Sequence, residues 1–267
     1  MTILVGVDGS VSSLHAVRWA AAEAARRRVP VRLCHVCPDQ TEAGHQVLRE
    51  AAELAHDVEA HTELKVGLPA AQLIEESKTA ELLVLGSRGL GGFAGMLVGS
   101  VSCGVAAHGH CPVVVIRGRT LDDATPDAGP VVVGVDGSAV SDAAVEFAFA
   151  EARLRDVPLV AVHTWTDMAA GETWSVLPLD IDYEAVAKDE DHLLTERMAG
   201  WRQRFPDVEA RTQVIRDRPV RGLLTAAEDA QLIVVGSRGR TALTGVGLGS
   251  TSQALLHHST CPVAVAR

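Results

Sequence analysis

Residues 82–100 read LLVLGSRGLGGFAGMLVGS, and residues 232–250 read LIVVGSRGRTALTGVGLGS. Each stretch begins with four apolar residues, which are typical of a buried parallel strand. Each continues with glycine, two residues, glycine, nine residues, and then glycine and serine, and the two copies lie 150 residues apart. Glycines between a strand and a helix expose backbone amides that can hold phosphate. The repeat therefore predicts two nucleotide sites, one in each half.

The beginnings of the two halves repeat as well. Residues 5–10 and 133–138 both read VGVDGS, at an offset of 128 residues. The second half therefore carries 22 extra residues, which fall around 164–184. A period of this length is too long for a solenoid unit and suits two domains in tandem. We predict a first domain, a polar linker and a second domain over residues 1–119, 120–129 and 130–267, respectively.

Short apolar runs alternate with helix-like stretches along both halves. The predicted strands cover residues 3–7, 31–36, 61–66, 82–85, 113–117, 131–135, 159–163, 209–215, 232–235 and 263–267. The predicted helices cover residues 13–28, 44–58, 69–78, 100–107, 141–155, 184–204, 219–228 and 250–257. This alternation indicates an α/β fold of two tandem doubly wound domains, each a five-stranded parallel sheet with helices on both faces. We expect the strand order 3-2-1-4-5 in each domain.

That order places the ends of the first and fourth strands side by side. Asp8 and Asp136 end the first strands, and Gly86 and Gly236 end the fourth strands. Ligands of such sheets bind outside the carboxyl ends of the strands, where the winding reverses. We therefore expect these residues to flank a crevice in each half.

Composition and charge exclude several classes of function. The formal net charge of −10 disfavours a nucleic-acid partner, and the basic run 26–28 ends a predicted helix, where cations suit the helix dipole. No apolar stretch reaches the roughly 18 residues that span a bilayer, and the first residues lack signal-peptide features. An odd number of cysteines, five, suits a reducing compartment. We expect a cytoplasmic protein that has no membrane partner.

Two groups of cysteine and histidine could hold a metal, but we interpret both as structural. Residues 34–37 read CHVC within an apolar run that predicts a strand, on which positions three apart face opposite sides. The other group joins the cysteine of each Cys-Pro-Val segment to histidines whose spacing differs between the halves. Its members are His108, His110, Cys111, His257, His258 and Cys261. We predict no metal site.

The usual phosphate motifs do not account for the glycine pattern. A P-loop requires Gly-x-x-x-x-Gly-Lys-[Ser/Thr], and none of the three lysines follows glycine in that way. A weak dinucleotide fingerprint at 89–94 is broken in the second half, and it follows the fourth strand rather than the first. The pattern is therefore neither a P-loop nor a dinucleotide fingerprint.

The longer pattern has a physical logic of its own. Gly86 lets the chain turn off the strand and approach a ligand closely, and Gly89 continues that concave backbone. Gly99 precedes Ser100 at a helix N-terminus, where N–H groups and the helix dipole favour anions. The hydroxyls of Ser100 and Ser102 can bind phosphate or cap the helix. The alternative is a loop rich in glycine for conformational reasons only, which the recurrence of the spacing disfavours.

With these motifs the chain resembles the universal stress proteins in their tandem, ATP-binding form. That family carries Gly-x2-Gly-x9-Gly-[Ser/Thr] after its fourth strand, and both halves match it. The two VGVDGS openings, the Ser-Val-Ser run at 100–102 and the Cys-Pro-Val strands are also similar to the family. The resemblance covers nearly the whole chain and implies one ATP site in each domain.

The resemblance also implies which residues form the two sites. Those of site one are Asp8, Val36, Gly86, Arg88, Gly89, Gly99, Ser100 and Val101. Those of site two are Asp136, Thr164, Gly236, Arg238, Gly239, Gly249, Ser250 and Thr251. The aspartates would lie near the adenosine, Val36 and Thr164 would present backbone groups to adenine, and the others would cradle the ribose and phosphates. Arg88 and Arg238 could screen phosphate charge or be solvated loop arginines.

ATP binding does not by itself imply catalysis. Phosphoryl transfer also needs a metal held by the protein, a positioned nucleophile and charge stabilisation. Asp8 or Asp136 could assist Mg²⁺ through water, but no general base is evident, and we predict no catalytic residue. The favoured hypothesis is a nucleotide-dependent regulator of stress responses and growth. The alternatives are a slow ATPase or autophosphorylating protein, and a nucleotide-free interaction scaffold.

Members of the family pair two domains through their fifth strands, which implies that residues 113–116 and 263–266 meet about a pseudo-two-fold axis. A further homodimer and an unknown protein partner stay open. The first half has few residues between its second strand and second helix, and the second half has Thr164 in place of Val36. We therefore expect site one to be more open and the two sites to bind ATP with unequal affinity.

Overall fold

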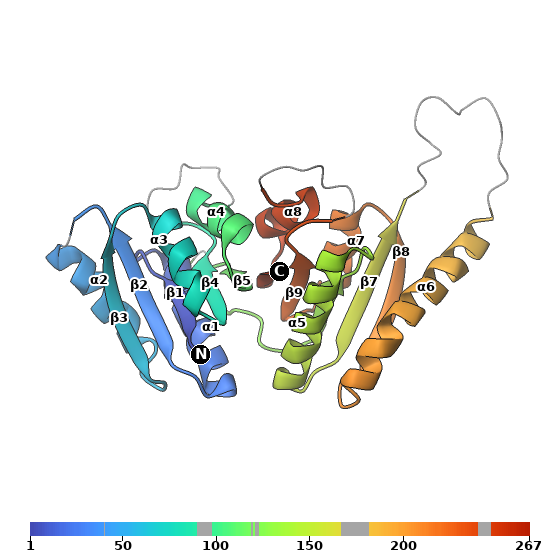
Figure 1. Ribbon diagram of the computed structural model, residues 1–267, viewed down its shortest axis with the longest axis horizontal. Helices are drawn as coiled ribbons and strands as arrows, with labels where there is room; N and C mark the ends of the chain where they lie inside the picture. Colours follow the sequence, from blue (N-terminus) through green and yellow to red (C-terminus); the bar gives the residue numbers. More distant parts are fainter. Residues whose placement is uncertain (40, 90–97, 119, 121–122, 167–181, 240–246) are drawn as a thin grey trace, which may run out of the picture.

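The computed structural model describes the chain except for residues 40, 90–97, 119, 121–122, 167–181 and 240–246. Its strands form one ten-stranded sheet in the order β3-β2-β1-β4-β5-β10-β9-β6-β7-β8, with helices on both faces (Figure 1). The first half comprises β1 (Ile3–Gly6), α1 (Val11–Arg27), β2 (Val31–Cys37), α2 (Glu42–Glu53), β3 (Ala60–Val66), α3 (Pro69–Glu76), the 3₁₀ helix η1 (Ser77–Thr79), β4 (Leu82–Gly86), α4 (Ser100–His108) and β5 (Val113–Ile116). The second half comprises β6 (Val131–Gly134), α5 (Ala139–Arg155), β7 (Leu159–Trp165), α6 (Tyr183–Arg204), β8 (Ala210–Arg216), α7 (Pro219–Ala226), β9 (Leu232–Gly236), α8 (Ser250–His258) and β10 (Val263–Ala266).

The strand order 3-2-1-4-5 occurs in both halves, and neighbouring strands within a half are parallel. The halves do not form two separate sheets, because β5 pairs antiparallel with β10 and places Val115 opposite Val263. All residues of both strands are buried. Such a pairing removes two apolar edges and their unpaired backbone groups from water. The expected meeting of the fifth strands is therefore present within the chain.

Strand residues alternate between two apolar cores, one on each face of the sheet. Ile3 and Val5 point into the core covered by α1, α2, α5 and α6, whereas Leu4 points into the core covered by α3, α4, α7 and α8. Both cores consist mainly of alanine, valine, leucine and isoleucine side chains. This arrangement leaves the carboxyl ends of the strands as the edge at which loops from both faces meet.

The observed element bounds agree with the sequence predictions within about two residues, except at the end of α2. That helix ends at Glu53 rather than at residue 58. The amide groups of Leu54 and Ala55 donate to carbonyls three residues back, which tightens the chain into a turn. Among the described residues, no helix combines the length and the apolar character needed to cross a bilayer.

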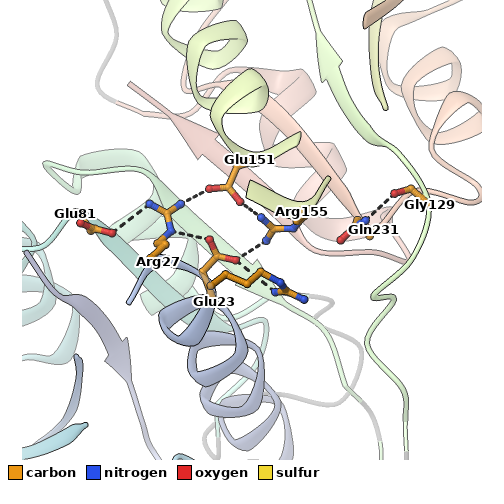
Figure 2. Close-up of polar contacts among 8 residues, drawn as sticks. Glu23, Arg27, Glu81, Gly129, Glu151, Arg155 and Gln231 are labelled. Carbon is orange, nitrogen blue, oxygen red and sulfur yellow. Dashed lines mark hydrogen bonds and ion pairs between the residues drawn. The ribbon is translucent and has the colours of Figure 1, made fainter. Parts of the chain in front are cut away.

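Four charged residues form a buried ring where α1 and α5 meet, between the two halves (Figure 2). Arg27 Nε lies 2.6 Å from Glu23 Oε1, and Arg155 Nη2 lies 2.6 Å from Glu23 Oε2. Glu151 accepts from both arginines and closes the ring. Both carboxylates are fully buried. The interpretation of residues 26–28 as cations that only complement a helix end is therefore incomplete, because Arg27 holds the two halves together.

The surroundings of this ring depart from the pseudo-two-fold symmetry. Arg27 Nη1 also binds Glu81 at 3.2 Å, just before β4. The equivalent position before β9 is Gln231, whose amide donates to the Gly129 carbonyl at 2.7 Å instead (Figure 2). The first half thus adds a carboxylate to the ring that the second half lacks.

Candidate functional site

Each half has a cavity outside the carboxyl ends of its central strands. Site one, in the first half, is a cavity of about 500 Å³, and site two, in the second half, is one of about 460 Å³, both within the range of small-molecule sites. The residues predicted for site one all line its cavity: Asp8, Val36, Gly86, Arg88, Gly89, Gly99, Ser100 and Val101. Those predicted for site two also line its cavity: Asp136, Thr164, Gly236, Arg238, Gly239, Gly249, Ser250 and Thr251. The fold brings each predicted set together, while their role in ATP binding stays a prediction.

The aspartate of each site is held by the serine two residues later. Asp8 Oδ1 accepts from Ser10 N at 3.0 Å and from Ser10 Oγ at 2.6 Å. Asp136 is held in the same way by Ser138, at 2.9 and 2.7 Å. The glycine between them is left-handed, with φ of 81° at position 9 and 77° at position 137, which explains the repeated Asp-Gly-Ser sequence.

The second oxygen of each aspartate lies against the glycine loop. A Cβ atom added to Gly89 would come within 2.4 Å of Asp8 Oδ2, and one added to Gly239 within 2.7 Å of Asp136 Oδ2. Only glycine therefore lets the loop pass this close to the carboxylate. The loop and the aspartate consequently form one continuous wall of each cavity.

The structure gives a further reason why position 86 is a glycine. A Cβ atom there would lie 2.6 Å from the backbone of Ser12 and Ser13, at the start of α1. The glycine allows the end of β4 to pack against this helix, and it also lines the cavity, so close approach to a ligand stays a prediction. Arg88 strengthens the same junction, because its carbonyl accepts from Ser10 Oγ at 2.9 Å.

Helices α4 and α8 begin at the cavities with glycine caps. Gly99 and Gly249 are the N-cap residues, and among the described residues no side chain caps either helix. The first N–H groups of each helix therefore face the cavity, where the helix dipole favours an anion. Ser100 and Ser250 are exposed at the first helical position.

Ser102 does not serve as the phosphate donor that the sequence suggested. Its hydroxyl donates to the Gly86 carbonyl at 2.7 Å, and Ser252 makes the same bond to the Gly236 carbonyl at 2.7 Å. These hydroxyls fasten each helix to the end of the neighbouring strand. They position the helix N-terminus, and both serines also line their cavities.

Positive charge lies at the mouth of both cavities. Arg88 and Arg238 are exposed and line their respective cavities. A guanidinium group beside an uncapped helix N-terminus raises the local attraction for anions. Both features of each site thus favour a negatively charged ligand.

The sequence interpretation missed one wall of each cavity. The start of α3 contributes Pro69 and Leu73 to site one, and the start of α7 contributes Pro219 and Leu223 to site two. These residues are apolar and suit a flat, uncharged part of a ligand. A proline in the first helical turn, directly after a strand, was the signal available in the sequence.

The two cavities differ in polarity. Val36 and Val101 of site one are replaced by threonines in site two, where His163 also lines the cavity. The His163 Nδ1 atom lies 2.7 Å from the Val135 carbonyl, and its Nε2 atom lies 3.3 Å from Glu190 of α6. Residues 167–181, which include most of the extra loop of the second half, lie outside the described residues. The expectation that site one is more open therefore stays a prediction.

The cysteines and histidines singled out in the sequence lie in β2, at the ends of α4 and α8, and in the short loops that follow these helices. Within the described part of the chain, no group of three or more His, Cys, Asp or Glu side chains is arranged to hold a metal ion. All five cysteines are free thiols, and burial raises the pKa of Cys34 and of Cys111 to about 12. Residues 34–37 lie in β2 as predicted.

The model of the universal stress protein family matches residues 1–117 and 128–267. The chain belongs to the universal stress protein family. It is 41% identical to universal stress protein Rv2005c of Mycobacterium tuberculosis, over 99% of this chain and 96% of that protein. It is 37% identical to universal stress protein Rv2623 of the same organism, with the same coverage.

Solved structures show the same fold. A universal stress protein from Archaeoglobus fulgidus superposes with a TM-score of 0.69 and 22% identity, covering 100% of this chain and 96% of that chain. A universal stress protein in complex with cAMP is 33% identical and covers 44% of this chain and 96% of its own, with a TM-score of 0.40. The two successive matches of the family model show that the chain consists of two universal stress protein domains in tandem.

Proposed function

We propose that this universal stress protein is an ATP-binding regulator with one ATP site in each half. The observation that carries the proposal is the meeting of two kinds of surface in one cavity. The uncapped N-termini of α4 and α8 and the glycine loops offer backbone N–H groups to phosphates. In the same cavities, residues such as Leu73 and Leu223 offer an apolar wall to a base.

The aspartates support binding rather than chemistry in this proposal. Ser10 and Ser138 hold one oxygen of Asp8 and Asp136, and the other oxygen lies against the glycine loop. A carboxylate fixed in this way is suited to orient a ribose hydroxyl. Mg²⁺ that accompanies the phosphates would reach Asp8 or Asp136 through water.

Occupancy can regulate only if ATP binds two conformations with different affinity. Helix α1 provides a mechanical link, because Ser10 caps its first turn at site one and Arg27 ends it in the interdomain ring. Helix α5 connects site two to the same ring through Ser138 and Arg155. ATP that shifts the start of either helix would therefore act on the contact between the halves.

Identification and titration of the bound nucleotide test this proposal. Protein purified without dialysis is denatured, and the released nucleotide is identified and counted, with up to two ATP per chain expected. Calorimetric titration of nucleotide-free protein should show two sites, one lost in Ser100→Asp and the other in Ser250→Asp, because a carboxylate at the helix N-terminus repels phosphate. Ser100→Ala and Ser250→Ala are matched controls that keep the backbone donors and should retain binding.

Incubation with labelled ATP separates regulation from turnover. Retention of intact ATP at a stoichiometric level supports the regulator. Sustained release of ADP, or label that survives denaturation, would instead show a slow ATPase or an autophosphorylating protein. Absence of any nucleotide binding would overturn the proposal and leave an interaction scaffold.

A further inference from the structure

One arginine from each half reaches the end of a helix in the other half. Strands β5 and β10 run antiparallel, with Val115 opposite Val263. The residue that follows β5, Arg117, therefore lies beside the segment that leads from α8 into β10. By the same register, Arg267 after β10 lies beside the segment that leads from α4 into β5.

Both arginines donate hydrogen bonds to carbonyls at the C-terminal ends of these helices. Arg117 donates from Nη1 to the Ser259 carbonyl at 2.9 Å and from Nη2 to the His257 carbonyl at 2.5 Å. Arg267 donates from Nη2 to the Ala106 carbonyl at 2.6 Å. The last four carbonyls of a helix have no intrahelical donor, and cations are favoured there by the helix dipole. Each helix is thus capped by an arginine of the opposite half.

The capped helices are the ones that begin at the two cavities. Helix α8 runs from Gly249 and Ser250 in site two to the carbonyls that Arg117 holds, and α4 runs from Gly99 to those near Arg267. Each helix has nine residues, which corresponds to a length of roughly 14 Å. A short helix with few turns transmits a shift of one end to the other. The position of each anion-binding end therefore depends on an arginine from the other half.

We propose that Arg117 positions the phosphate-binding helix of site two and that Arg267 positions that of site one, so that each site is completed by the opposite half. This inference rests on the proposed ATP binding at both sites. The arginines do not touch the ligand in this proposal, because they act at the far ends of α8 and α4. They are positioning residues whose effects must cross between the halves.

A second observation links Arg267 to both sites. The pKa of Arg267 is lowered, mainly by burial and in second place by repulsion from the like charge of Arg238. Arg238 belongs to the glycine loop of site two, whereas Arg267 caps the helix of site one. Negative charge bound beside Arg238 would reduce this repulsion and strengthen the cap of the other site's helix.

Single-site backgrounds make the crossed dependence measurable. Ser100→Asp leaves site two for titration with ATP, and Ser250→Asp leaves site one. In the first background Arg117→Ala should weaken ATP binding about 3- to 10-fold, as expected for the loss of a charged cap, and Arg267→Ala should change it less than about 2-fold. In the second background the two variants should exchange their effects. Arg117→Lys and Arg267→Lys should recover part of the affinity, and Arg49→Ala, on the exposed surface of α2, is a matched control.

Hydrogen exchange of the nucleotide-free full-length chain gives a readout that does not need ATP. Arg117→Ala should speed exchange of amides in α8 and not in α4, and Arg267→Ala should do the opposite. Crossed effects in both assays support the inference. Effects confined to each arginine's own half, equal effects on both sites, or no effect would overturn it. If the wild type binds no ATP, the proposed function fails, and the exchange pattern alone decides whether the arginines position these helices.

Discussion

Replacement of Arg155 by methionine should strongly destabilise the contact between the two halves. The Arg155 side chain is 3% exposed and donates to Glu23, at 2.6 Å, and to Glu151. Methionine keeps much of the apolar contact with Trp19, whose ring lies 5.5 Å from the guanidinium carbon. It leaves two fully buried carboxylates that share Arg27, while Glu23 keeps only a longer contact with Arg26, whose Nη1 lies 3.7 Å from Glu23 Oε2.

The expected loss in the free energy of unfolding is about 3–5 kcal/mol, the usual cost of removing one partner from a buried ion pair. For a chain of this size that loss lowers Tm by roughly 10 °C. Urea unfolding at pH 8, followed by tryptophan fluorescence, measures this loss of stability, because the Trp19 indole lies against the Arg155 guanidinium group. The loss should be smaller at pH 5, where a buried carboxylate can accept a proton.

A second variant separates unpaired charge from lost packing. Glu151→Gln combined with Arg155→Met removes one charge of each sign and leaves the Glu23–Arg27 pair intact. The double variant should recover at least about 2 kcal/mol of the loss. Glu81→Gln, which copies the natural Gln231 of the other half, is a matched control with an expected cost of about 1 kcal/mol. The reasoning is refuted if Arg155→Met costs less than about 1 kcal/mol, or if the double variant is as unstable as the single one.

Three further predictions concern pH, the glycine loop and the thiols. Burial raises the pKa of the Glu151 carboxyl group to about 7, so the folded state binds a proton there more tightly than the unfolded state does. The stability that this proton contributes is complete below about pH 4.5 and is lost as the pH rises through 7. The urea midpoint should therefore fall between pH 5 and 8, and an equally steep fall in Glu151→Gln would contradict this assignment. Gly86→Ala should lower stability by about 1–3 kcal/mol in thermal unfolding, because the added Cβ would lie 2.6 Å from backbone atoms of α1. Gly99→Ala should cost little, because its nearest neighbour, the Ser87 carbonyl oxygen, would lie 3.7 Å from the added Cβ. Equal losses would argue against the packing explanation. Of the five thiols only Cys37 and Cys103 are partly exposed. Native protein should therefore react rapidly with at most two equivalents of a thiol reagent, and denatured protein with five. A third fast equivalent in native protein would show that a buried thiol is accessible.

The gathering of the predicted site residues at each cavity was predictable because it depends on local sequence and on one general rule of topology. Apolar runs end at Asp8 and Gly86, and parallel strands bring their carboxyl ends to a common edge. A repeated glycine spacing then placed equivalent residues in both halves. For the same reason the walls supplied by α3 and α7 were harder to foresee, since a leucine on an amphipathic helix has no mark that distinguishes a cavity wall from core.

The roles of individual side chains required the packed structure. Gly86 is explained by the backbone of Ser12, which lies 74 residues earlier in the chain, and Ser102 is explained by a carbonyl of β4. Neither contact has a sequence pattern, because each depends on how a helix rests against a strand end. The sequence alone permitted a phosphate contact for Ser102 and a ligand contact for Gly86.

The sequence by itself determined the strand–helix alternation, the internal repeat, the membership of each half in one family and the residues that gather at each cavity. These features follow from short-range periodicity and from residue types that tolerate few backbone conformations. Only the tertiary structure decided how the halves depend on one another. Glu23, Arg27 and Arg117 look like ordinary surface charges in the sequence, and they become buried or bridging only because β5 and β10 pair. That pairing joins segments roughly 150 residues apart, and no local pattern records which side chains such a contact brings together.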